Sequence, residues 1–90
     1  MLAILGSTML KRETIPIADI YVPIKRRATL EQERVDEIAA SILEKGLQAP
    51  IRVRPDGARF VLVEGLHRLE AAKALGEETI AAFLVDARKH

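Results

Sequence analysis

The stretch "ATLEQERVDEIAASILEKG" carries the strongest structural pattern in the chain, that of an amphipathic helix with both ends marked. Thr29 suits an N-cap, and Gln32 follows at the spacing of a capping box. Apolar side chains recur at helical spacing and would form one stripe, made of Val35, Ile38, Ala39, Ile42 and Leu43. Gly46 can end the helix, with Leu47 folding back onto its last turn. We therefore expect a long helix that packs one face against the rest of a small domain.

Short apolar segments around this helix indicate strands. In "IRVRPDGARFVLVEG", Ile51 and Val53 alternate with arginines, and a Pro-Asp-Gly turn follows. The continuous apolar run at 60–63 predicts a more central strand. The segment "ETIPIADIYV" predicts a short edge strand and a turn, because Pro16 cannot donate to a central ladder. A last strand is expected at 79–85.

A second, shorter helix is expected at 67–75, ended by Gly76. Four of its apolar side chains would face inward: Leu69, Ala71, Ala72 and Leu75. The resulting order, β-α-β-β-α-β with short connections, indicates a compact single α+β domain with a small mixed sheet and two main helices. We place this domain at residues 13–86, after a flexible N-terminus at 1–12 and before a tail at 87–90.

Composition narrows the chemistry that the chain can support. Its 90 residues suffice for one small domain with a thin core, and its three aromatic residues leave that core to aliphatic side chains. The absence of cysteine and the presence of only two histidines argue against disulfides, thiol catalysis and a protein-ligated zinc site. A net charge of +1 gives no strong signal for polyanion binding. No segment has the apolar length of a membrane span, and we expect a cytoplasmic protein.

The turn "EGLHR", residues 64–68, joins the end of a strand to the start of a helix, where unpaired N–H groups attract anions. Gly65 lets a ligand approach the backbone, and Arg68 can hold phosphate oxygens in a two-pronged contact. His67 can donate to a phosphate or act as an acid or base. Glu64 could hold Mg²⁺ beside the phosphates. The turn therefore predicts a phosphate site, with Glu64 and His67 as candidate catalytic residues.

A purely structural arrangement would also explain this turn. Arg68 could pair with Glu64 or Glu70, and His67 could simply be partly buried. Against this, basic side chains are usually found in the last turn of a helix, because the helix dipole disfavours them in the first. A bound anion would relieve that conflict, but the pattern alone leaves both interpretations open.

The run "IAASILEKGLQAPIRVRPDGARFVLVEGLHRLEAAKALGEETIAAFLV" resembles the N-terminal domain of the ParB partition proteins, in the ParB/sulfiredoxin superfamily. The most specific parts are residues 41–54 and 64–76, whose order and spacing both match. The resemblance covers roughly residues 13–86, which is nearly the whole chain.

The resemblance implies that the turn holds the phosphates of a nucleotide with Mg²⁺: CTP in partition proteins, ATP in sulfiredoxins and in related free-serine kinases. Partition proteins have a "GERR"-type sequence there and sulfiredoxins have "GCHR", so Gly65 and Arg68 match both. His67 matches only the sulfiredoxin side. Leu66 stands where sulfiredoxins have their nucleophilic cysteine, which excludes sulfiredoxin chemistry. It also replaces the partition-protein glutamate, whose metal-linked role Glu64 could take.

The same resemblance implies a role for two residues of the long helix. Sulfiredoxins use a basic residue and a hydroxyl there, and Arg34 and Ser41 fall at those places on about the same helix face. The alternative is that Arg34 pairs with Glu31 or Glu37 on the surface and that Ser41 is a small filler.

The basic cluster before the long helix also resembles, loosely, the arginine-containing box of partition proteins. This likeness implies that Lys25, Arg26 and Arg27 contact phosphate, either of a nucleotide or of DNA. As an alternative, such a run of charges forms a solvated loop.

Three functions remain open. The first is a nucleotide-binding switch whose DNA contacts or self-association as a homodimer respond to the nucleotide, in processes such as plasmid partition or phage DNA regulation. No recognition helix is visible, so either this is an excised or stand-alone domain or a partner supplies the DNA contact. The second is an NTP-dependent phosphotransferase, an ATPase or a weak nuclease built on Glu64, His67 and Arg68. The third is a protein-interaction module with a decayed pocket.

Overall fold

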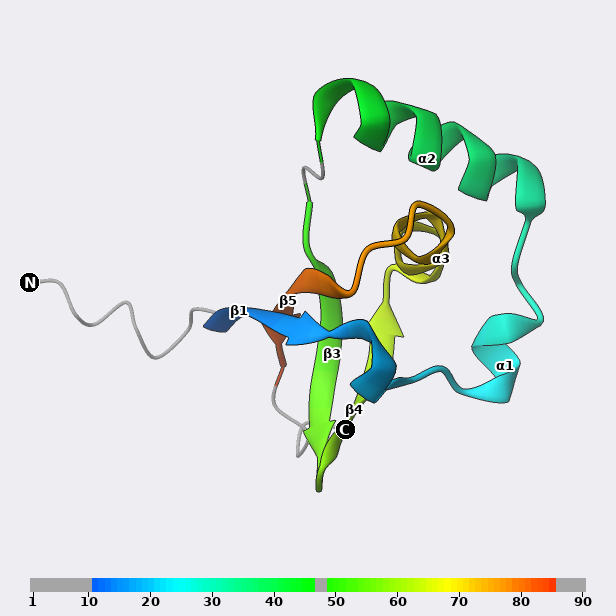
Figure 1. The fold of residues 1–90 in the computed structure, drawn as a ribbon. Helices are drawn as coiled ribbons and strands as arrows, with labels where there is room; N and C mark the ends of the chain where they lie inside the picture. The colour runs from blue at the N-terminus through cyan, green and yellow to red at the C-terminus, as the bar shows by residue number, and fades with distance from the viewer. Residues whose placement is uncertain (1–10, 47–48, 86–90) are drawn as a thin grey trace, which may run out of the picture.

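The computed structural model describes residues 11–46 and 49–85. The chain runs through β1 (Lys11–Pro16), the 3₁₀ turn η2 (Ile17–Asp19), β2 (Ile20–Tyr21), α1 (Ile24–Arg27), α2 (Gln32–Lys45), β3 (Ile51–Asp56), β4 (Arg59–Glu64), α3 (Leu66–Ala74) and β5 (Thr79–Leu84) (Figure 1). The α+β class with a mixed sheet and two main helices is confirmed. β1 begins ahead of the expected domain start at residue 13, while residues 1–10 and 86–90 lie outside the described part.

Two short elements, β2 and α1, were not expected from the sequence. β2 has two residues and pairs in parallel with β4, which adds a strand to the second edge of the sheet. α1 is a four-residue helix formed by "IKRR", where a solvated loop was the alternative. Neither element is long enough to leave a periodic pattern in the sequence.

The five strands form one sheet in the order β1-β5-β3-β4-β2. β1 is an edge strand, as expected, and Pro16 is its last residue. β3 and β5 run parallel, whereas β1 is antiparallel to β5 and β4 is antiparallel to β3. The expectation that residues 60–63 form the more central strand is wrong, because β3 is the middle strand. Consecutive strand residues point to opposite faces, and Val61 and Leu62 are both buried, so the apolar run reflects cover on both faces of β4.

α3 lies between the sheet and α2 (Figure 1). The core beneath and around it is aliphatic, as the composition predicts, and its buried cluster comprises Ile15, Val22, Ile51, Val53, Leu62, Leu66, Leu69, Ala72, Ile80 and Ala82. Leu69, Ala71 and Ala72 of α3 are buried as expected, and Leu75 is half-buried. Among the described helices, none is long and apolar enough to cross a membrane.

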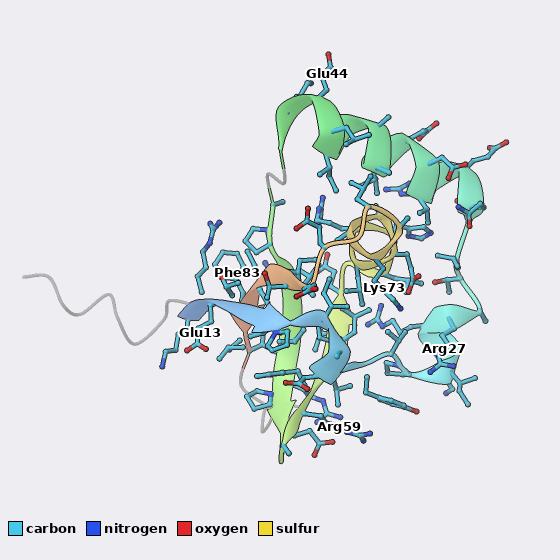
Figure 2. The ribbon with its side chains drawn as sticks, in the orientation of Figure 1. Glu13, Arg27, Glu44, Arg59, Lys73 and Phe83 are labelled. Carbon is cyan, nitrogen blue, oxygen red and sulfur yellow. The ribbon has the colours of Figure 1, made fainter. Side chains whose placement is uncertain are left out.

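α2 is less buried than its apolar stripe predicts. Val35 is buried, while Ile38 and Ile42 are half-buried against α3. Leu43 is 75% exposed, so its assignment to the buried stripe is wrong. A helix turns about 100° per residue, so Leu43 lies at the edge of the stripe, about 100° around the helix from the half-buried Ile42. Glu44 follows on the outer surface (Figure 2).

The start of α2 also differs from the expected capping box. The helix begins at Gln32 with Glu31 as its N-cap, and no side chain caps it. The Thr29 hydroxyl instead donates to the carbonyl of Arg26 at 2.7 Å, at the end of α1, and Gln32 donates to Asp36 at 2.9 Å. Because α1 forms, its last carbonyls need donors, and Thr29 supplies one. The other end is as expected, with Gly46 at φ 84° donating to Ile42, while Leu47 lies outside the described residues.

The turn from β4 to α3 requires a glycine for two reasons. Gly65 is the N-cap of α3 and has φ 110° and ψ 29°, a conformation that side chains with a Cβ rarely adopt. A Cβ at this position would lie 2.7 Å from Cγ2 and 3.2 Å from Cα of Ile51. Ile51 is itself fully buried in β3, so it has little room to move. The turn is therefore pressed directly against the central strand.

We expect Leu69→Ala to lower the free energy of unfolding by about 2–5 kcal/mol, because it opens a cavity in the core. Leu43→Ala is the matched control, since it makes the same change on an exposed helical site and should cost less than about 0.5 kcal/mol. Urea unfolding followed by circular dichroism measures both. Equal costs would contradict the layer arrangement of α3 and α2.

A second pair of variants tests the β4–α3 turn. Gly57→Ala should cost about 1–2 kcal/mol for its left-handed backbone, because φ is 63° and the space around a Cβ is open. Gly65→Ala should cost about 1–3 kcal/mol more than that, since its Cβ also overlaps Ile51. The same urea titration reports the difference. Indistinguishable midpoints for the two variants would show that the turn is not packed as described.

Candidate functional site

A groove of about 420 Å³ opens beside the EGLHR turn. We call it the EGLHR groove, and its lining consists of Arg26, Thr29, Arg34, Ile38, Glu64, Gly65, Leu66, His67 and Arg68. One wall comes from α1, the connection after it and the first half of α2, and the other comes from the end of β4 and the first turn of α3. Folding thus brings the turn together with two arginines that lie at least 30 residues earlier in the sequence.

Positive charge dominates the lining of the groove. Arg26, Arg34 and Arg68 come from three different helices, and Glu64 is the only carboxylate among the lining residues. Glu64 also lies 3.7 Å from the Nε of Arg52, a partly exposed pairing on the neighbouring strand. No side chain caps the N-terminus of α3 at Gly65, so its first N–H groups add to the attraction for an anion.

The alternative ion pairs weighed for Arg68 are not formed. Glu64 pairs with Arg52, and Glu70 pairs with Lys73 at 3.2 Å. Within residues 11–46 and 49–85, Arg68 makes no ion pair, and Arg34 pairs with neither Glu31 nor Glu37. Both guanidinium groups therefore line the groove without a carboxylate to neutralise them.

His67 is half-buried and makes a specific contact across the groove. Its Nε2 accepts a hydrogen bond from the backbone N–H of Glu31 at 3.0 Å. A ring nitrogen that accepts carries no proton, so the tautomer that fits this bond has its proton on Nδ1. A role as general base at Nε2 would require that bond to break.

Ser41 does not reach the groove. It is exposed on α2 and is absent from the lining, although it shares a helix face with Arg34. Seven residues span roughly 10 Å along a helix axis, so the same face continues past the groove.

The three basic residues of α1 do not all line the EGLHR groove. Arg26 lines the groove, whereas the Nε of Arg27 donates to the carbonyl of Val22 at 3.1 Å and borders a separate pocket near Tyr21. Lys25 is exposed and lines neither pocket. Figure 2 shows Arg27 on α1. Thr29 was not expected to line the groove, because its predicted role was to cap α2.

The groove does not supply a metal site by itself. The described part of the chain holds no group of three His, Cys, Asp or Glu side chains placed to bind a metal ion. Mg²⁺ takes six oxygens and is often held by one or two carboxylates together with substrate phosphates. Glu64 fits that pattern only if a nucleotide brings the remaining oxygens.

Comparisons with known proteins agree with this fold. The chain is 45% identical over 64 residues to the probable chromosome-partitioning protein ParB of Campylobacter jejuni, which is 71% of this chain and 23% of that protein. It spans about a quarter of the length of the curated partition proteins that it matches.

Solved structures give the same relationship. Sulfiredoxin from Arabidopsis thaliana has a TM-score of 0.75 and 32% identity, over 84% of this chain and 85% of that one. C-terminally truncated ParB from Caulobacter crescentus, complexed with CTP-γ-S, has a TM-score of 0.74 and 28% identity, over 87% and 46% of the two chains. The same protein complexed to the centromeric parS site has a TM-score of 0.70 and 27% identity, over 86% and 42%.

The family described as the ParB N-terminal domain matches residues 5–90, which is nearly the entire sequence. A partition protein and a sulfiredoxin share its fold. This chain therefore belongs to the ParB N-terminal domain family.

Proposed function

We propose that this domain binds a nucleoside triphosphate, CTP or ATP, through its phosphates in the EGLHR groove. One observation carries the proposal: three arginines from three helices line the groove beside the uncapped start of α3, with one carboxylate among them. A lining of this kind attracts a highly charged anion more strongly than a neutral ligand.

Each residue of the groove receives a role from its position. Arg68 lies in the first turn of α3 and would hold phosphate oxygens with two N–H donors. Arg26 and Arg34 would approach the same phosphates from the opposite wall. Glu64 would hold Mg²⁺ together with phosphate oxygens, after leaving its weak, exposed pairing with Arg52. Ser41 is left out of the site because it does not line the groove.

The relatives support nucleotide binding without deciding the base. The Caulobacter protein was solved with CTP-γ-S, at 28% identity to this chain. The sulfiredoxin likeness includes His67 but not the cysteine, since Leu66 occupies that position and is buried in the core. CTP is therefore the first nucleotide to test, with ATP beside it.

A role in DNA partition is the second part of the proposal. The Campylobacter relative is a probable chromosome-partitioning protein, and the Caulobacter relative was solved on parS. Lys25 is exposed outside the groove, so it is a candidate DNA contact, whereas Arg26 is assigned to the nucleotide. Nucleotide binding would then control DNA contacts or pairing of two copies of the domain.

Binding is favoured over phosphotransfer by the state of the two candidate catalytic residues. Glu64 is assigned to Mg²⁺ and not to proton transfer, and the Nε2 of His67 is occupied by the Glu31 N–H. Within the lining of the groove no second carboxylate stands near Glu64. A general base needs an open nitrogen or oxygen within reach of the proton that it takes.

We expect CTP or ATP, titrated with Mg²⁺ into the wild type, to give binding heat that Arg68→Ala reduces. Loss of charged hydrogen bonds worth about 1.5–3 kcal/mol corresponds to roughly a ten- to hundredfold weaker affinity. Isothermal titration measures this directly and identifies the preferred base.

Arg59→Ala is the control, because it removes the same charge at the β3–β4 hairpin (Figure 2). There the Cζ atom of Arg59 lies 4.4 Å from the centroid of the Tyr21 ring. It should leave nucleotide affinity within about twofold. Equal losses in both variants would indicate general charge attraction and not the groove. If neither nucleotide binds to folded wild type, the proposal fails and a protein-interaction module becomes the better explanation.

A further inference from the structure

One hydrogen bond joins the two walls of the EGLHR groove. The backbone N–H of Glu31 donates to Nε2 of His67 at 3.0 Å, across 36 positions of sequence. We call this contact the His67 latch. It is set apart from the other side-chain hydrogen bonds of the described residues, which connect positions at most five apart.

The wall that the latch holds has little other support. α1 contains no buried residue, and residues 28–31 are all exposed. The hydrogen bonds of this segment are local, such as Thr29 to Arg26 and Arg27 to Val22. In the structure described, the latch is the one hydrogen bond that ties the segment to α3.

The latch also fixes the first turn of α2. Glu31 is the N-cap of that helix, and its carbonyl accepts from Arg34 at 3.1 Å and Val35 at 3.2 Å. Its backbone N–H has no acceptor within the helix and donates to Nε2 of His67. The imidazole therefore contacts the residue that caps α2, three positions before Arg34 of the groove lining.

The two ring nitrogens of His67 have different tasks in this arrangement. Nε2 accepts from Glu31, which places the imidazole proton on Nδ1. Nδ1–H has no protein acceptor among the described residues, and His67 lines the groove. A phosphate oxygen could accept from Nδ1–H while Nε2 keeps its bond to the opposite wall.

We propose that His67 is a positioning residue that couples phosphate occupancy at the turn to the placement of Arg26 and Arg34 on the α1–α2 wall. The inference rests on the proposed function, because the coupling needs an anion in the groove. His67 acts through Glu31 and α2 and does not exchange protons with the ligand. Occupancy on the Nδ1 side orients the ring, and the oriented ring strengthens the latch.

The first experiment needs no nucleotide. Long-range ¹H–¹⁵N correlation spectra distinguish the imidazole tautomers, and the chain has only one other histidine, His90. We expect the proton of neutral His67 on Nδ1 and slowed hydrogen exchange at the Glu31 amide. His67→Ala should speed that exchange. Ser41→Ala, a change on α2 outside the groove, should not. A proton on Nε2, or an unprotected Glu31 amide in the wild type, overturns the proposal.

Two substitutions of His67 distinguish the latch from a direct contact with phosphate. Gln in place of His67 puts an acceptor near the position of Nε2, and Asn puts a donor near the position of Nδ1. We expect His67→Gln to keep the Glu31 amide protected and to bind CTP or ATP closer to wild type than His67→Asn does. His67→Asn should lose protection at residues 28–31 and weaken binding roughly fivefold or more, the loss of about one hydrogen bond.

The reverse order of affinities, with Asn like wild type and Gln like Ala, would show that His67 only touches the ligand and would overturn the positioning role. Equal nucleotide affinities of the His67→Gln, His67→Asn and His67→Ala variants would also overturn the positioning role. A wild type that binds neither nucleotide would defeat the proposed function and the coupling that rests on it, whereas the tautomer and the Glu31 exchange rate decide the latch separately.

Discussion

The close approach of Gly65 to Ile51 determines how α3 sits on the sheet. A Cβ at residue 65 would overlap a side chain that is itself fully buried in the central strand. The contact lets α3 begin directly above β3, so that Leu66 and Leu69 enter the core from its first turn. Packing therefore requires a glycine at residue 65 whether or not the turn binds an anion. The proposal of a phosphate site rests instead on Arg26, Arg34 and Arg68, which make no ion pair within the described residues.

The two walls of the EGLHR groove differ in how firmly they are held. The wall from α3 is rooted in the aliphatic core, where most of the stability of a small domain resides. The wall from α1 and α2 is attached through Val35, a few half-buried contacts and the His67 latch. Segments with few buried apolar contacts open at lower free energy than the core does. A ligand that contacts both walls would therefore change the mobility of α1 and α2 far more than that of α3.

The sequence predicted those elements that follow a regular spacing of apolar residues or that end at a glycine. Alternation, helical spacing and glycine predicted β1, β3, β4, β5, α3, the end of α2 at Gly46 and the EGLHR turn, but not the two-residue β2. Short elements such as α1 left no such pattern, so the arginine wall of the groove could not be foreseen from spacing. Thr29 shows why: one hydroxyl can cap a following helix or close a preceding one, and the choice depends on whether α1 forms. Sequence spacing placed Arg34 and Ser41 on one face of α2, but only the fold shows how far the groove extends along it.

The edges of the sheet bear on how copies of this domain behave when crowded together. β1 exposes one side of its backbone, yet it carries Lys11, Arg12 and Glu13 and ends in Pro16, which has no N–H to offer. The opposite edge, β2, is only two residues long. Charged, proline-ended or very short edges are poor templates for strand addition from another chain. Neither edge of the described sheet therefore favours strand addition from a second copy, so we do not expect concentrated copies of this domain to aggregate through their sheets.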